Sequence, residues 1–391
     1  MSGAEGSALR AEVLEAPDAL ARLEPEWLRL SLDVERPSCF ALPGYFRVWR
    51  RVLAEDVTSA VVVARAGGAL RGIMPIMRAR VWRGPSCAPR HDFAPADRTL
   101  VESRRPRPFP VRQVCPVVSM PATLVAPAPL CREADAEAVT HAMARALLAL
   151  PRWDVIALPV YEGVEQASWL AAFAAQGCRP LLHPLGRFVQ GIRDVRPFDA
   201  IVARQNQKYR QNVRRARAAA ESLGVEIAVH KGSTAVTAHL EAFAAVARAS
   251  WKHLGREGQQ VTLPYEGRQQ AFFEALLAEE DTGLTPVLAV ASMGGEAIAA
   301  LLAVRHAATL TALLTFLDDR AAAASPGLLL LGRLVDWAAE HGIRWFDLNA
   351  THEWVRHLAD ERRSQNNVVV FAPTLRGRLY ERIARSAGNL R

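Results

Sequence analysis

Residues 310–352 constrain the possible folds of this chain more than any other stretch. An apolar run over residues 310–317 predicts a β-strand, and a second short apolar run, at 345–349, follows a helical repeat of apolar residues. Ser325-Pro326-Gly327 is typical of a helix start, because Ser is a favourable cap and Pro loses no useful N–H at the first helical position. His341-Gly342 predicts the end of that helix. This order favours a strand–helix–strand unit of an α/β fold with a mixed sheet.

The predicted helix start is also a candidate anion site. The first N–H groups of a helix have no partner within the helix, and the helix dipole favours negative charge at that end. Gly327 lets the backbone approach a ligand closely. A purely structural role remains the more common explanation for such a segment, because no GxGxxG or GKT spacing accompanies it.

Length and charge restrict the broad class of protein. The chain has 391 residues, enough for two domains, and half of them are hydrophobic, which is typical of a globular protein. The net charge of +8 favours an anionic partner such as a nucleotide cofactor, a nucleic acid or a membrane surface.

The cysteines and the N-terminus exclude several classes. Five scattered cysteines include no CxxC pair, so we expect neither a zinc site nor a disulfide framework, and we expect no other metal. The first 20 residues lack the basic and apolar regions of a signal peptide, and no apolar run is long enough to span a membrane. We therefore expect a cytoplasmic protein without a transmembrane segment, with a possible attachment to machinery at the inner membrane face.

The two halves of the chain present the same order of patterns. Each half contains a pair of apolar runs joined through Gly-Gly, at Gly67-Gly68 and at Gly294-Gly295, which is a hairpin signal. Trp153-Asp154-Val155 in the first half corresponds to Trp345-Phe346-Asp347 in the second. We interpret this order as an internal duplication, with domains at residues 1–193 and 194–391.

A basic helix is predicted near the start of the second half, within residues 198–223. Its apolar stripe leaves Lys208, Arg214 and several further arginines on the remaining surface. A solvated face is the usual explanation for such charges. The alternative is an anionic ligand, such as a sugar nucleotide, a lipid pyrophosphate or tRNA.

An ordered set of motifs gives the second half a family resemblance. The set consists of Lys208-Tyr209-Arg210-Gln211-Asn212-Val213-Arg214-Arg215-Ala216-Arg217 with Leu223-Gly224-Val225, Trp251, Gly294-Gly295 with Ile298-Ala299, Ser325-Pro326-Gly327, and Gly342-Ile343 before Asp347. Over residues 195–372 this set resembles the GNAT acyltransferase superfamily, and within it the cellulose-biosynthesis-type acetyltransferases. The tandem layout resembles that of the peptidoglycan-bridge aminoacyltransferases, whose two halves are both GNAT-like.

The resemblance implies where the ligands would bind. Strands 310–317 and 345–349 would splay apart and admit acetyl-CoA or another acyl-CoA. The residues that would hold its pyrophosphate are Arg320, Ser325, Pro326, Gly327 and Leu328. The acceptor would enter from the opposite side, and the residues that would bind it are Lys208, Arg214, Trp251, Tyr265 and Arg356. Trp251 fits a core position equally well.

The candidate catalytic residues follow the second strand. Asp347 occupies the position that matches the family, and Asn349, two residues further along a predicted strand, would point to the same face. His352 and Glu353 come directly after and could move a proton. Structural roles in capping and backbone hydrogen bonding explain the same residues. The Tyr-Lys pair typical of the family is absent here, and Arg356 cannot replace the Lys as a base.

These observations favour an acyltransferase that moves an acetyl or other acyl group from acyl-CoA to an amine or hydroxyl of a saccharide or a cell-envelope precursor. Two alternatives remain. The tandem layout and the basic helix favour an aminoacyl-tRNA-dependent transferase, and the missing Lys favours a non-catalytic module of a polysaccharide-synthesis complex. The acceptor, the length of the acyl chain and the oligomeric state are not predicted.

Overall fold

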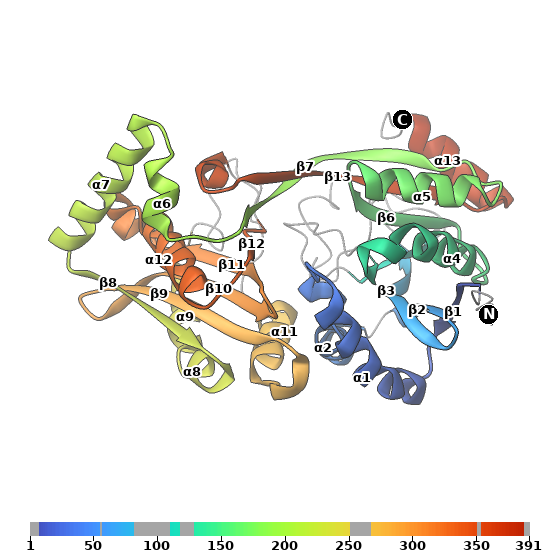
Figure 1. The fold of residues 1–391 in the computed structure, drawn as a ribbon, viewed down its shortest axis with the longest axis horizontal. Coiled ribbons are helices and arrows are strands. Elements are labelled where there is room, and N and C mark those ends of the chain that lie inside the picture. Colours follow the sequence, from blue (N-terminus) through green and yellow to red (C-terminus); the bar gives the residue numbers. More distant parts are fainter. Residues whose placement is uncertain are drawn as a thin grey trace, which may run out of the picture. The chain divides into compact units, whose positions relative to one another are not determined.

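The structure, a computed structural model, describes residues 8–54, 57–81, 110–117, 129–250, 267–349 and 353–386. The chain forms two compact units (Figure 1): unit 1 comprises Met1–Arg187 and Arg363–Arg391, and unit 2 comprises Phe188–Arg362. The domain boundary between residues 193 and 194 was predicted from an internal duplication of the sequence, and it stays a prediction. The compact units group the C-terminal segment with the first half of the chain.

Unit 1 contains a sheet with helices packed against it. Its elements are β1 (Arg10–Leu14), α1 (Pro17–Asp33), η1 (Cys39–Ala41), α2 (Pro43–Leu53), β2 (Thr58–Ala66), β3 (Ala69–Val81), β4 (Val111–Pro116), β5 (Leu130–Cys131), η2 (Glu133–Asp135), α4 (Ala136–Leu148), β6 (Val155–Tyr161), α5 (Val164–Ala174), the start of β7 (Leu181–Arg193), most of β13 (Glu361–Phe371) and α13 (Leu375–Ser386).

Unit 2 repeats this pattern of elements. It contains the end of β7, α6 (Phe198–Ala203), α7 (Gln207–Ser222), β8 (Val225–Lys231), α8 (Ser233–Thr237), α9 (Leu240–Ala249), α11 (Gly267–Ala278), η3 (Glu280–Thr282), β9 (Thr285–Met293), β10 (Glu296–His306), β11 (Thr309–Leu317), η4 (Asp319–Ala324), α12 (Pro326–Glu340), β12 (Trp345–Asp347) and η5 (Glu353–His357). None of the helices in the described ranges is long and apolar enough to cross a bilayer.

The strand order is the same in both units. In unit 1 it is β1-β2-β3-β4-β6-β13, and in unit 2 it is β8-β9-β10-β11-β12-β7. The first four strands are antiparallel in each case, and the fifth runs parallel to the fourth. This match confirms the predicted tandem architecture and the mixed sheets.

The sixth strand of each sheet comes from the other half of the sequence. β7 follows the elements of unit 1 along the chain, yet its residues 191–193 pair antiparallel with β12. β13 follows the elements of unit 2, yet Gln365–Phe371 pair antiparallel with β6. The halves have therefore exchanged their sixth strands.

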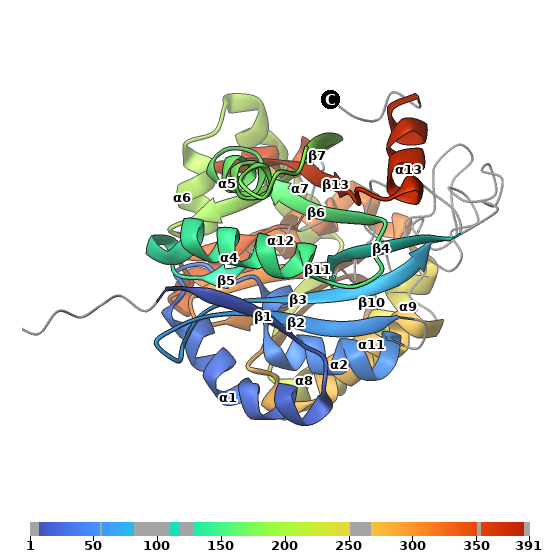
Figure 2. The same cartoon turned by 90° about the vertical axis from the view of Figure 1, so that its right-hand side faces the viewer.

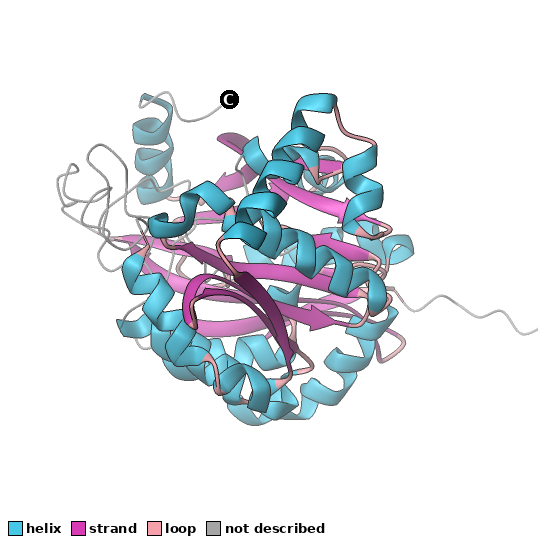
Figure 3. Ribbon diagram, turned by 90° about the vertical axis from the view of Figure 1, so that its left-hand side faces the viewer, coloured by secondary structure: helices cyan, strands magenta, loops and turns pink. Residues whose placement is uncertain are grey.

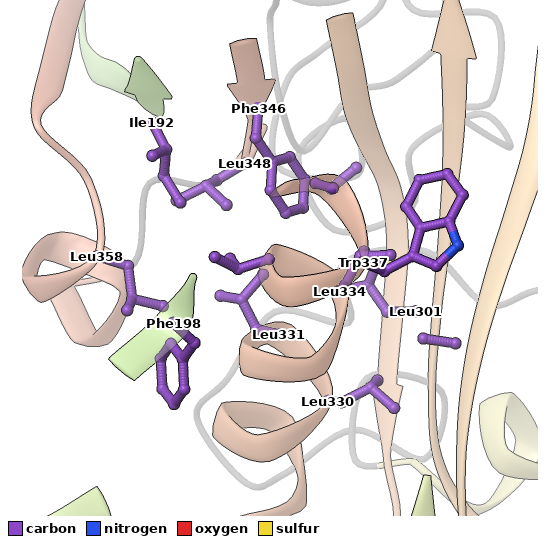
Figure 4. Close-up of a cluster of buried hydrophobic side chains, with 14 of the residues drawn as sticks. Ile192, Phe198, Leu301, Leu330, Leu331, Leu334, Trp337, Phe346, Leu348 and Leu358 are labelled. Carbon is purple, nitrogen blue, oxygen red and sulfur yellow. The ribbon is translucent and has the colours of Figure 1, made fainter. Parts of the chain in front are cut away.

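The core of unit 2 is built around α12. Leu330, Leu331 and Leu334 pack against Phe198 and Phe346 in one buried cluster (Figure 4). Helices cover both faces of the sheet (Figure 3), and residues 298–304 of β10 are accordingly all buried.

Several local predictions hold and others are wrong. Both Gly-Gly hairpins form, and their four glycines have positive φ, as tight hairpin turns require. The single helix predicted at 198–223 is instead two helices, because Asn206 starts α7 by accepting a hydrogen bond from the Tyr209 N–H at 2.9 Å. Residues 181–193 form one continuous strand, β7. The strand predicted at 345–349 ends at Asp347.

A buried carboxylate joins three elements of unit 1. Asp154, which is fully buried at the start of β6, accepts hydrogen bonds from Arg112 of β4 at 2.7 Å and from Arg376 of α13 at 3.2 Å. Burial alone would raise the pKa of Asp154, but the hydrogen bonds from Arg112 and Arg376 outweigh it and lower the pKa below its ordinary value.

We expect Asp154→Asn to lower the free energy of unfolding by about 3–5 kcal/mol, because it leaves two arginines without their buried anion. The control Asp33→Asn, which removes a half-exposed ion pair with Arg132, should cost at most about 1 kcal/mol. Because the folded pKa of Asp154 is depressed, its contribution is complete above the ordinary carboxyl pKa of about 3.9 and disappears as the pH falls through the lower folded value. Urea unfolding of both variants at neutral and acidic pH measures these changes in the free energy of unfolding. Equal losses of stability in the two variants at neutral pH would contradict the prediction.

Candidate functional site

The candidate site of unit 2 lies where two parallel strands part. The ladder between β11 and β12 contains only three pairs, Thr309 with Trp345, Leu310 with Phe346, and Thr311 with Asp347. Beyond Thr311, β11 continues to Leu317 while still paired with β10 on its other side. The pairing of the two strands therefore ends at Asp347, and the cleft expected between them stays a prediction.

Helix α12 begins beside the end of β11. Ser325 is the N-cap residue and Pro326 is the first helical residue, as predicted, but Ser325 has a left-handed conformation and its hydroxyl makes no capping hydrogen bond. A side-chain Cβ at Gly327 would lie 3.1 Å from Leu317, so this glycine allows the helix to approach β11 closely. The N–H of Gly327 forms no hydrogen bond with any described residue. The helix start thus retains a donor for an anion.

Arg320 is already engaged by two carboxylates. Asp318 accepts hydrogen bonds from the N–H of Arg320 at 2.9 Å and from its guanidinium at 2.7 Å, and Glu296 accepts from the guanidinium at 3.1 Å. The hydrogen bond to Asp318 is the main cause of a raised pKa for Arg320. A phosphate near Arg320 would compete with these two carboxylates for its positive charge.

The corresponding helix of unit 1 has the opposite electrostatic character. Helix α4 connects β4 to β6, as α12 connects β11 to β12. Glu133 and Asp135 of η2 directly precede α4, and Glu137 lies in its first turn, whereas the first turn of α12 carries no acidic residue. Carboxylates at a helix N-terminus already complement the dipole and repel phosphate. Of the two equivalent positions, α12 is therefore the one suited to a phosphate.

Asp347 and Asn349 stand at the end of β12. Both side chains are buried. The strand on which the predicted common face relied stops at Asp347, and Asn349 has a left-handed backbone with φ of 46°, so strand alternation does not determine the direction of the Asn349 side chain. Asp347 pairs in register with Thr311, which is also buried.

The other predicted residues are distributed as follows. Lys208 and Arg214 are exposed on α7, and Arg356 is exposed on η5. Trp251, Tyr265 and His352 lie outside the described residues, and Glu353 begins η5, although its side chain is not described. The start of α12 and the end of β12 both belong to unit 2, and their catalytic and binding roles stay predictions.

Tyr209 is a candidate residue that the sequence analysis did not single out. Its buried hydroxyl has no hydrogen-bond partner among the described residues, and its ring lies 4.6 Å from that of His357, centroid to centroid. Burial raises the pKa of Tyr209 to about 12, so the hydroxyl stays protonated at neutral pH and can donate. The available signal was a tyrosine within the apolar stripe of α7.

Helix α7 packs beside the start of α12. Ala216 and Ala220 of α7 form a small buried cluster with Ala324 and Leu329. The exposed cations of α7 therefore belong to a helix that flanks the candidate phosphate position, where they raise the local positive potential. Within the described ranges, no group of three or more His, Cys, Asp or Glu is placed to hold a metal ion.

Comparisons with known proteins agree with this architecture. Residues 207–353 match the family model described as "Acetyltransferase (GNAT) domain", whereas no curated protein matches the chain in sequence. The solved structure of FemX is similar over 95% of this chain and 99% of its own, with a TM-score of 0.57 and 10% identity. A conserved protein of unknown function from Bacteroides thetaiotaomicron is similar over 92% and 99%, with a TM-score of 0.53 and 10% identity. The chain therefore has a tandem GNAT-like fold and is an acyltransferase; the narrower assignment to the cellulose-biosynthesis type stays a prediction.

Proposed function

We propose that this acyltransferase uses an acyl-CoA donor bound in unit 2, with the pyrophosphate at the start of α12 and the thioester near the end of β12. One observation carries the proposal: the pairing of β11 with β12 ends at Asp347, and α12, which follows β11, has no acidic residue in its first turn, whereas the equivalent helix of unit 1 begins among three carboxylates. A helix N-terminus of this kind favours phosphate.

The acceptor that we propose is an amine or hydroxyl group of a saccharide or of a cell-envelope precursor. Its nucleophilic atom attacks the thioester carbonyl, loses a proton to a base, and CoA leaves as a thiol. The support for this class is the set of motifs quoted above from residues 195–372. Asp347 lies where the acceptor and the thioester would meet, and Asn349, His352 and Glu353 follow it along the chain as further candidates for proton transfer or oxyanion binding.

Gly327→Asp tests the donor position. The new carboxylate joins the first turn of α12, where it complements the helix dipole and repels a phosphate, so we expect acetyl-CoA to bind at least about tenfold more weakly in calorimetry. Gly327→Ala is the matched control, because it brings the same Cβ towards Leu317 without any charge. Equal losses of affinity in the two variants would attribute the effect to packing, and unchanged affinity in Gly327→Asp would refute the donor position.

Asp347→Asn tests the chemical step. We expect kcat to fall by about 10²–10⁴-fold with little change in the affinity for acyl-CoA, if Asp347 acts on the reacting groups. Asp199→Asn removes an exposed carboxylate of the same unit and serves as the control. A parallel loss of donor affinity and turnover would place Asp347 in the scaffold instead.

A second candidate function is aminoacyl transfer from tRNA, which the surface of α7 favours. Lys208, Arg214 and Arg215 are exposed and form no ion pair or hydrogen bond through their side chains within the described part of the chain. Such cations are available for phosphates of a nucleic acid backbone.

Replacing Lys208, Arg214 and Arg215 with Gln separates these two functions. If tRNA is the donor, the wild-type protein binds it with a steep salt dependence, and the triple variant reduces the slope by about 2–3. Replacing the exposed Arg22, Arg145 and Arg152 of unit 1 removes the same charge as a control. With acyl-CoA as the donor, we expect tRNA binding to be weak and equal in both variants.

A further inference from the structure

Helix α13 presents an apolar stripe to solvent. Six large hydrophobic side chains are exposed among the described residues, and three of them lie on this one helix at four-residue spacing. Leu375 is 87% exposed, Leu379 is 55% exposed and Ile383 is 50% exposed. Residues four apart lie above one another on a helix, so the three side chains form one continuous stripe about 12 Å long.

The opposite face of α13 is fixed to unit 1. Tyr380 is buried in a cluster with Val155 and Val369, and Arg376 donates to Asp154 and to the carbonyl of Pro110. A side chain at Gly377 would overlap the carbonyl oxygen of Ala372. The helix therefore cannot turn its apolar stripe inward, and it stands at the end of β13 (Figure 2).

Two arginines border the stripe. At about 100° per residue, Arg382 and Arg378 lie on the Leu375 side of the stripe, about 20° and about 60° from Leu375 around the helix axis. Both are exposed, and their side chains form no ion pair or hydrogen bond among the residues that the structure describes. The single acidic residue of α13, Glu381, is held by Arg385 at 2.9 Å. The outward face is thus aliphatic and positively charged.

We propose that α13 docks this face into the headgroup region of a bilayer that contains anionic lipids. The three aliphatic side chains would enter the acyl boundary, while the two guanidinium groups remain at the level of the lipid phosphates. A second copy of the chain is a poorer occupant, because pairing two stripes would bring four arginines together without compensating carboxylates. Charge complementarity selects an anionic surface over a neutral one.

Vesicle co-sedimentation of the full-length protein tests the proposal. We expect binding to vesicles of equal parts phosphatidylglycerol and phosphatidylcholine, and none to pure phosphatidylcholine. The triple variant Leu375→Ser, Leu379→Ser, Ile383→Ser should lose binding. The double variant Arg378→Gln, Arg382→Gln should weaken it by about tenfold or more, because each arginine contributes near an anionic surface.

Matched control variants replace exposed leucine and arginine side chains elsewhere in unit 1. Leu32→Ser replaces a leucine that is 60% exposed on α1, and Arg22→Gln with Arg145→Gln removes two exposed arginines; both should bind vesicles as the wild type does. Circular dichroism confirms that each variant is folded. Failure of the wild type to bind anionic vesicles, or full binding by the triple variant, overturns the proposal. So does a change of the triple variant from dimer to monomer in size-exclusion chromatography, which would show that a second copy covers the stripe.

Discussion

The backbone of β12 is the element on which the candidate site depends. This strand is only three residues long and buried, so its N–H and C=O groups must find partners on both sides. β11 supplies one side over three residues, and residues 191–193 of β7 supply the other. The exchanged strand therefore holds Asp347 at the point where β11 departs. Without β7, the end of β12 would be a sheet edge and its last residues would not be fixed.

The two units show how one architecture supports different electrostatics. Their strand orders and their parallel fourth and fifth strands correspond one to one. The helix that connects those strands is preceded by Glu133 and Asp135 in unit 1, whereas in unit 2 it follows Ser325 and begins with Pro326 and Gly327. The fold thus provides the same helix dipole twice, and the neighbouring side chains decide whether that dipole is already satisfied.

Local signals allowed much of the fold to be predicted from the sequence. Gly-Gly turns determine hairpins between neighbouring strands, and the start and end of α12 follow from Ser325-Pro326 and His341-Gly342. The strand exchange was not predictable in this way, because β6 and β13 pair residues that are about 200 positions apart and no local pattern encodes their pairing.

In the candidate site, too, the features with a local sequence signal were predicted and the long-range contacts were not. The helix start was predicted because its signal is contiguous in sequence. The engagement of Arg320 by Glu296 and the contact of Tyr209 with His357 were not, because they join residues far apart in the chain. The end of β12 before Asn349 was missed for a different reason: an Asn tolerates a left-handed backbone, and the apolar pattern alone does not reveal that change of conformation.

The same long-range contacts determine which face of α13 is exposed. β13 ends where the N–H of Ala372 donates to the carbonyl of Asp154 at 2.9 Å, and the carboxylate of Asp154 then holds Arg376 in the first turn of the helix. At Gly377 the backbone of α13 lies close to that of Ala372, where a side chain would not fit. An isolated amphipathic helix would bury its most apolar face, yet here Leu375, Leu379 and Ile383 stay outside because a buried ion pair fixes the other face. The exposed stripe is therefore a consequence of the anchoring of β13 and α13 in unit 1, and a partner with both apolar and anionic character is the one that complements it.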